Sequence, residues 1–330
     1  MQKFLSWMMS GVGDRFASRE VQDAVDLLIA EVEPKVKLLP GGQRQLRRGV
    51  RHLLAQLQEV GRLLPAPLDL SPAGYSSDRR VGLLFASPQS LCDSLRASDA
   101  IRAHLASPQS PEQLQVMLVM QLNEETRLGS QLLPDGSVRS DVPQRVLSFE
   151  RHRFIAASAQ HDELLRVSRQ QAYSLLCRNL AYGISQAESE RRLLEVERRA
   201  LQLQLQHKTN VLNAEALNLH GSMTPAQMAE RLAQVEQALA ASQLVASLQG
   251  KLKLIRQVIE SPDDFVHASL QTAWVDRMGV VLSPAEGGQQ LDYANIDMGY
   301  LQKRRRVVFA ANLSRSDLRE WQQRWPALEN

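Results

Sequence analysis

The side chains of this sequence best suited to binding a metal or transferring a proton are its histidines. The seven histidines are His52, His104, His152, His161, His207, His220 and His267. None forms an HExxH motif or a pair four residues apart, and none stands near a cysteine at zinc-binding spacing. His152 and His161 could meet only through folding. The sequence therefore predicts no metal site and no cofactor.

Motifs for phosphate binding and nucleophilic catalysis are also missing from the sequence. It contains no GxxxxGK[ST], GxGxxG or GxSxG pattern. The paired carboxylates Glu124-Glu125 and Asp263-Asp264 stand at the ends of expected elements, where capping and turn roles are commoner than acid–base catalysis. We therefore predict no catalytic residue, and an enzyme whose site is dispersed along the chain stays an alternative.

The two cysteines, Cys92 and Cys177, each fall in a helical pattern without a CxxC partner. Isolated cysteines of this kind are typical of buried free thiols in a reducing compartment. Only seven of the 39 basic residues are lysines, and such arginine dominance is typical of GC-rich bacterial genomes. We therefore expect a bacterial, cytoplasmic protein.

Two arginine-rich segments could bind anions. The first contains Arg44, Arg47, Arg48 and Arg51, and the second is Lys303-Arg304-Arg305-Arg306. The arginines of the first segment could simply form the solvated face of a helix. The second segment is expected in a strand, where side chains alternate, so only about half of its charges can share a face. The net charge of +3 is too small to imply nucleic acid by itself. Binding of nucleic acid or an anionic membrane surface is thus an alternative that we do not favour.

The N-terminal residues 1–16 carry a short apolar stretch that includes Phe4, Trp7 and Met8. The stretch is broken by serines and followed by charges, which disfavours a signal peptide. It could lie on a membrane surface, but a first helix that docks on the core is the favoured interpretation. No run approaches the roughly 20 apolar residues of a membrane-spanning helix, so we predict no transmembrane segment.

The first third of the chain is expected to be helical. Helices are expected over 18–39, 43–64, 88–96 and 111–122. The first should be ended or kinked at Pro34, because proline lacks the amide hydrogen that a helix interior needs. Residues 65–80, which are rich in Pro, Ser and Gly, are predicted to be a linker across the surface.

Short strands are expected on both sides of a long helical region. They are predicted over 127–133, 137–141, 146–155, 273–282, 291–296 and 305–311, and the end of a helix could precede residue 273. The first two should form a hairpin around Leu133-Pro-Asp-Gly-Ser137. These strands predict a small antiparallel sheet.

The helical region between the strands should contain two long helices. The first is expected over 160–207, and the second should begin at a capping box from Thr224 to Gln227 and end near 259. Its apolar stripe changes side near 240–243, which predicts a kink or a change of packing partner there. A terminal helix should be capped by Ser316-Asp317.

These elements predict a mainly α, α+β fold with three parts. A helical region covers 1–122, a small α+β domain combines 123–159 with 260–330, and a long antiparallel helical hairpin over 160–259 is inserted between the strands. The leucines of this hairpin keep a coiled-coil spacing of seven residues along only one line, which disfavours a regular two-stranded coiled coil.

The stretch LQLQLQ at 201–206 alternates like a strand, but its helix-forming surroundings predict a helix. Two apolar lines result, about 140° apart on the helix. One contains Leu193, Val196, Ala200 and Leu203, and the other contains Leu194, Leu201 and Leu205. A single antiparallel helix would cover one line, so the other must meet a further helix of the chain, a second copy or another protein. The favoured function is therefore an interaction or scaffold protein, with the hairpin as contact surface.

Overall fold

The computed structural model of the chain describes residues 19–106, 111–132, 137–210, 223–300 and 303–325. Membrane-surface contact through residues 1–16, the turn of the expected strand hairpin and most of the connector near 208–223 lie outside these residues. The chain has a mixed α+β fold and divides into two units. Unit 1 combines the residues up to Leu53 with Ser174–Pro262, and unit 2 combines Leu54–Tyr173 with the residues from Asp263. The expected helical region 1–122 is thus divided between them.

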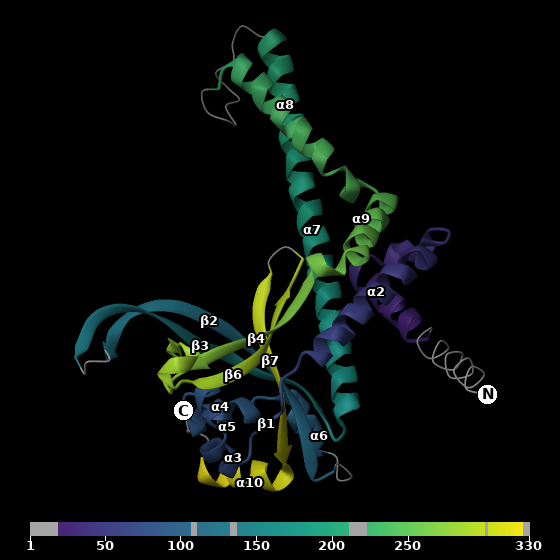
Figure 1. Ribbon diagram of the computed structural model, residues 1–330. Helices are drawn as coiled ribbons and strands as arrows, with labels where there is room; N and C mark the ends of the chain where they lie inside the picture. The colour runs from purple at the N-terminus through teal and green to yellow at the C-terminus, as the bar shows by residue number, and fades with distance from the viewer. Residues whose placement is uncertain (1–18, 107–110, 133–136, 211–222, 301–302, 326–330) are drawn as a thin grey trace, which may run out of the picture. The chain divides into compact units, whose positions relative to one another are not determined.

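Unit 2 is built on a seven-stranded sheet (Figure 1). Its strands are β1 (Leu68–Asp69), β2 (Gln113–Leu132), β3 (Val138–Ser158), β4 (Val266–Val275), β5 (Val281–Leu282), β6 (Gln289–Met298) and β7 (Arg304–Ser314). Six strands follow the antiparallel order β3-β2-β7-β6-β4-β5, and β1 pairs in parallel with β7. The predicted antiparallel sheet is confirmed in this form, with longer strands than expected.

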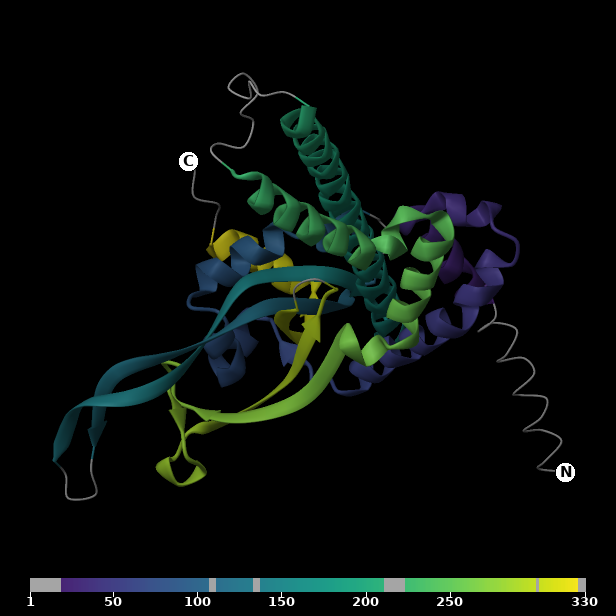
Figure 2. The same cartoon turned by 90° about the horizontal axis from the view of Figure 1, so that it is seen from above.

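The β2–β3 pair extends beyond the rest of the sheet. β2 pairs with β7 only from Gln113 to Met120, whereas its pairing with β3 continues to Leu132. Figure 2 shows the outer part as a curved ribbon of two strands. Near Leu147 this outer part still contacts another segment of unit 2, because the backbone N–H of Leu147 donates to the carbonyl oxygen of Gly279. Beyond that point its side chains are largely exposed.

The prediction of a helix over 111–122 is wrong, because these residues form the first half of β2. Leu114, Val116 and Leu118 are buried on one face of the sheet, and Met117 is buried on the other. A strand that is buried on both faces has a continuous apolar run, which periodicity cannot separate from a buried helix. The beginning of β4 at Val266 likewise corrects the expectation that a helix could precede residue 273.

The prediction of a surface linker over 65–80 is also wrong. This segment contains β1, α3 (Pro72–Ser77) and the beginning of α4 (Arg79–Leu84), and the side chains of Leu68 and Leu70 are fully buried. Ser71 and Asp78 cap the two helices by accepting hydrogen bonds from Gly74 N and Arg80 N. Its Pro and Ser residues therefore begin short helices rather than mark a loop.

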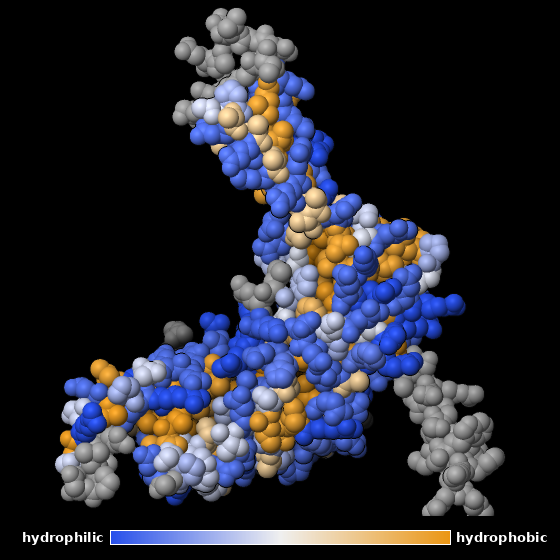
Figure 3. All heavy atoms as spheres, turned by 45° about the horizontal axis from the view of Figure 1, so that its top comes forward, coloured by the Kyte–Doolittle hydropathy of each residue, from blue (hydrophilic) through white to orange (hydrophobic). Residues whose placement is uncertain are grey.

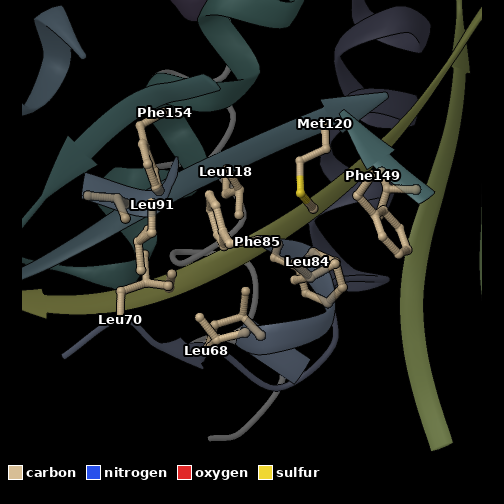
Figure 4. Close-up of a cluster of buried hydrophobic side chains, with 14 of the residues drawn as sticks. Leu68, Leu70, Leu84, Phe85, Leu91, Leu118, Met120, Phe149 and Phe154 are labelled. Carbon is tan, nitrogen blue, oxygen red and sulfur yellow. The ribbon is translucent and has the colours of Figure 1, made fainter. Parts of the chain in front are cut away.

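Short helices cover one face of the sheet (Figure 1). Besides α3 and α4 they are α5 (Pro88–Arg96), α6 (Asp99–Ala106) and α10 (Arg315–Arg324). Figure 4 shows the core on this face, where Leu84, Phe85 and Leu91 from the helical segment meet Leu118 and Phe154 from the strands. The predicted helix over 88–96 is confirmed in α5.

The other face of the sheet is covered in part by the first turns of α7 (His161–Asn210) and the end of α2 (Gly42–Arg62). Leu164 of α7 is fully buried against Met117, Val308 and Ala310, and Val60 packs against the same cluster. The terminal helix α10 is confirmed, but its cap is Ser314 rather than Ser316, with Asp317 in the capping box.

Unit 1 contains helical segments only, among its described residues. Residues 19–32 form a helix that ends before Pro34, as predicted, and Pro34–Leu38 continue as the 3-10 helix η1. The first half of α2 follows, which confirms the helix expected from residue 43. The Nζ atom of Lys251 in α9 (Leu248–Glu260) forms ion pairs with Glu33, at 2.5 Å, and with Glu188 of α7. These pairs join α9 to α7 and to Glu33 at the start of η1.

The helices between β3 and β4 are less regular than the predicted hairpin. α7 is a single helix of 50 residues, whereas the returning segment is α8 (Pro225–Ala241), the 3-10 helix η2 (Gln243–Ala246) and α9. The capping box from Thr224 to Gln227 is confirmed, as is the break near 240–243. The break lets α8 and α9 pack their apolar stripes against different segments.

Trp321 gives a test of the core of unit 2. Its indole Nε1 donates a hydrogen bond of 2.7 Å to the carbonyl oxygen of Leu70 inside the core. We expect Trp321→Phe to lower the free energy of unfolding by about 2–4 kcal/mol, because it removes buried contacts and the donor to a buried carbonyl. Chemical denaturation measures this change, with the partly exposed Trp274→Phe as control. Equal losses in both variants would contradict this role of Trp321.

Candidate interaction surface

The long helix α7 is stable as a helix because of its sequence. It contains no proline and only one glycine, Gly183, and Asp162 and Glu163 lie in its first turn, where negative charge is favourable. The stretch at 201–206 lies inside α7, so the prediction of a helix there is confirmed. Its alternating leucines must then point to different sides of the helix.

One of the two apolar lines is covered by α8 of the same chain. Leu201 is fully buried with Met228, Val235 and Leu239 of α8. Leu194 and Leu205 are partly buried against this cluster. The burial of this apolar line is therefore explained by contacts within the chain, with no need for a partner protein.

Polar contacts fix α8 on α7 at the sides of this cluster. Nε and Nη2 of Arg231 donate to the two carboxylate oxygens of Glu197 at 2.7 and 3.2 Å. Nη1 of Arg191 donates to the carbonyl oxygen of Leu239 at 2.8 Å and to Ser242 Oγ at 3.0 Å. The bidentate ion pair raises the pKa of Arg231, through the hydrogen bond to Glu197 and its negative charge.

The other apolar line remains exposed. The exposed fractions are 71% for Leu193, 65% for Val196 and 56% for Leu203. Ala200 on the same line is partly exposed. Figure 3 shows hydrophobic residues at the surface of the α7–α8 arm, at the top of the picture. No helix among the described residues of the chain covers this line.

Two further exposed residues of α7 belong to the same line, and the sequence reasoning missed them. Leu175 and Tyr182 precede Val196 and Leu203 at multiples of seven residues, with Ser189 as the remaining member. Leu193 and Ala200 complete the line, because each follows a member of this seven-residue series, Ser189 or Val196, by four residues. We call Leu175, Tyr182, Ser189, Leu193, Val196, Ala200 and Leu203 the exposed seam. Its spacing is that of a coiled-coil seam, and this signal was present in the sequence.

Charges of opposite sign border the two sides of the exposed seam. Arg192 and Arg199 are exposed on one side, and Glu190 is exposed on the other. Glu197 lies on the same side as Glu190 and is held by Arg231. In coiled coils, charges at these flanking positions set the choice and the orientation of the partner helix.

The arginine segments predicted from the sequence lie in different units. Arg44, Arg47, Arg48 and Arg51 are exposed in the unit 1 part of α2, and Arg47 donates to Gln22. In β7, Arg305 pairs with Asp297 at 3.7 Å, whereas Arg306 donates to Gln121 on the opposite face. The run from Lys303 is thus divided between two faces of the sheet.

Histidines and acidic residues do not converge on a metal site in the described part of the chain. His152 Nε2 lies 2.7 Å from the carbonyl oxygen of Leu84, and its ring stacks on Phe85 at 4.4 Å. His161 instead contacts Gln115. Burial lowers the pKa of His152. Its contacts are those of a core residue.

No helix within the described residues is long and apolar enough to cross a membrane. Comparisons of the chain with models of protein families, with curated proteins and with solved structures give no match.

Substitutions of Leu201 and Leu203 test directly which of the two apolar lines is covered. We expect Leu201→Ala to lower the free energy of unfolding by about 2–5 kcal/mol, because it leaves a cavity under α8. Leu203→Ala should change it by less than about 0.5 kcal/mol, because the side chain is exposed. Denaturant unfolding at low protein concentration measures both. Similar losses for the two variants would show that Leu203 is covered.

His152 predicts a pH dependence of stability. Because burial lowers its pKa in the folded chain, the unfolded chain takes up a proton first as the pH falls below about 6.5, and stability is lost below that value. Unfolding midpoints at about pH 7.5 and about pH 5.5 should therefore differ less in His152→Gln than in the unchanged chain. The exposed His267→Gln is the control, and an equal effect of both variants would contradict the prediction.

Proposed function

We propose that this protein is an interaction or scaffold protein whose contact surface is the exposed seam of α7. The observation that carries the proposal is the exposure of Leu193, Val196 and Leu203 on a helix whose other line is already covered. Full burial of one such side chain contributes about 1.5–3 kcal/mol. A partner helix that covered the seam would gain this free energy several times over.

The occupant that we propose is the same helix of a second copy, in parallel. In a parallel pair each basic flank faces the acidic flank of the partner, so that Arg192 of one copy lies near Glu197 of the other. In an antiparallel pair, like flanks would meet and repel each other. Arg192 and Arg199, which an antiparallel pair would bring against the same flank of the second copy, therefore support the parallel arrangement.

Other features support a scaffold in the cytoplasm. Cys92 and Cys177 are buried and free, which fits a reducing compartment. The helices α7–α9 follow β3 and precede β4 of the same sheet, which supports an insertion that carries the contact surface. We propose no catalytic role for the seam, because its side chains are mainly apolar.

The molar mass in solution tests the second-copy proposal. Light scattering at tens of micromolar should give a dimer, and the triple variant L193Q/V196Q/L203Q should weaken association on the order of a hundredfold. The matched control is L38Q/L128Q/L270Q, which changes three other exposed apolar residues and should remain a dimer. A monomer for the unchanged chain would sink the second-copy proposal.

Disulfide formation tests the parallel orientation. Ser189 is an exposed member of the seam, so Ser189→Cys should meet its own copy in a parallel pair and form a disulfide on mild oxidation. Gln202→Cys is the control, because residue 202 is exposed away from the seam. A dimer in which Ser189→Cys links no faster than Gln202→Cys would refute the parallel arrangement.

A further inference from the structure

Three arginines of unit 2 share one face of the sheet. Val119 of β2 pairs with Arg153 of β3 on one side and with Val308 of β7 on the other. Arg304 and Arg306 precede Val308 by four and two residues. Because side chains alternate along a strand, these arginines lie on the same face as Val119.

Gln121 lies on β2, the strand between those that carry Arg153 and Arg306. It follows Val119 by two residues, so it lies on the same face of β2, between β3 and β7. Its Oε1 accepts a hydrogen bond of 3.1 Å from Nη1 of Arg306. The only hydrogen bond between described residues that fixes the head group of Arg306 is thus to a neutral side chain.

Arg151 adjoins the group at a bulge in β3. Arg153 pairs with Val119 and Glu150 pairs with Gln121, so Arg151 and His152 stand together opposite one residue of β2. The φ angle of Arg151 is 55°, in the left-handed region that favours glycine. Arginine is disfavoured at this φ angle, so the backbone conformation does not explain why the chain has an arginine here.

The positive charges of the other three arginines are close enough to act on Arg306. Burial lowers the pKa of Arg306, and the positive charges of Arg304, Arg151 and Arg153 lower it further. Glu150 shares this face through its pairing with Gln121, and Glu125 lies further along β2 on the same face. Among the described residues, none of the four arginines forms an ion pair. The nearby acid Asp297 lies on the other face with Arg305.

We propose that Arg151, Arg153, Arg304 and Arg306 form a binding site for closely spaced phosphate groups. A guanidinium group binds phosphate oxygens in pairs, and several such groups on a solvent-facing sheet suit a multiply charged ligand. Arg153 is level with Val308 of β7, and β2 lies between their strands, which places β3 and β7 about 10 Å apart. Arg306 and Arg304 lie a further roughly 7 and 14 Å along β7 from that level. This spread exceeds a single phosphate and suits two or more.

The phosphates could come from a nucleic-acid backbone or from a small oligophosphate. Phosphate groups are common to both sources, and the proposed site recognises these groups rather than bases. The site is separate from the α7 seam, since all its residues belong to unit 2. Its test is therefore independent of the oligomer test.

Binding of two phosphate probes by the full chain tests the site. Inorganic tripolyphosphate is followed by titration calorimetry, and a fluorescent DNA duplex by anisotropy, both at about 50 mM salt. R304Q/R306Q should weaken binding at least about tenfold. The control R44Q/R48Q removes the same charge from exposed positions of unit 1 and should have little effect.

The two probes separate the two sources of phosphate. Tight binding of tripolyphosphate that is lost in R304Q/R306Q supports the site with a small oligophosphate as ligand. Binding of the duplex alone, with the same loss, supports it with nucleic acid as ligand. The proposal is overturned if neither probe binds, or if R44Q/R48Q weakens binding as much as R304Q/R306Q.

Arg151→Gly gives a second test that does not depend on a weakened fold. Glycine suits the left-handed backbone, so the midpoint of thermal unfolding should rise by about 2–4 °C. Binding of the phosphate probe should fall several-fold, because one charge is lost from the cluster. Unchanged binding in a stabilised Arg151→Gly variant would overturn the four-arginine site.

Discussion

The antiparallel pairing of β2 with β7 is the interaction on which the sheet of unit 2 depends. It joins two segments that are separated along the chain by all the residues of α7–α9. The chain must offset the entropy of closing so long a loop. It does so with residues buried on both faces, such as Val116 and Met117 in β2 and Phe309 and Ala310 in β7.

In unit 1, helix geometry sets a different constraint. With 3.6 residues per turn, leucines that alternate along the chain cannot share one side of a helix. α8 has a single apolar stripe and covers the line of Leu201. The line of Leu203 is left exposed. The helix α7 thus has a second apolar side, and burial of this side against another helix would stabilise it.

Most described charges near the packed helices have partners of opposite sign, whereas the arginines on the sheet face do not. Lys251 lies between Glu33 and Glu188, and Arg231 is paired with Glu197. Although burial lowers the pKa of Lys251, its hydrogen bonds to these acids raise it overall. For Arg306 the neighbouring charges are positive and act in the same direction as burial. Lys251 and Arg231 are thus paired with acids, whereas the four arginines of the sheet form no ion pair among the described residues.

The sequence by itself determined the local features: the end of the first helix before Pro34, the capping box at Thr224 and the break after α8. Each depends on residues a few positions apart. It did not identify the first half of β2, because burial on both faces removes the alternation that marks a strand. Only the tertiary structure decided which leucine line is covered, because both are equally apolar, and which arginines meet, because strand pairing joins residues distant in sequence.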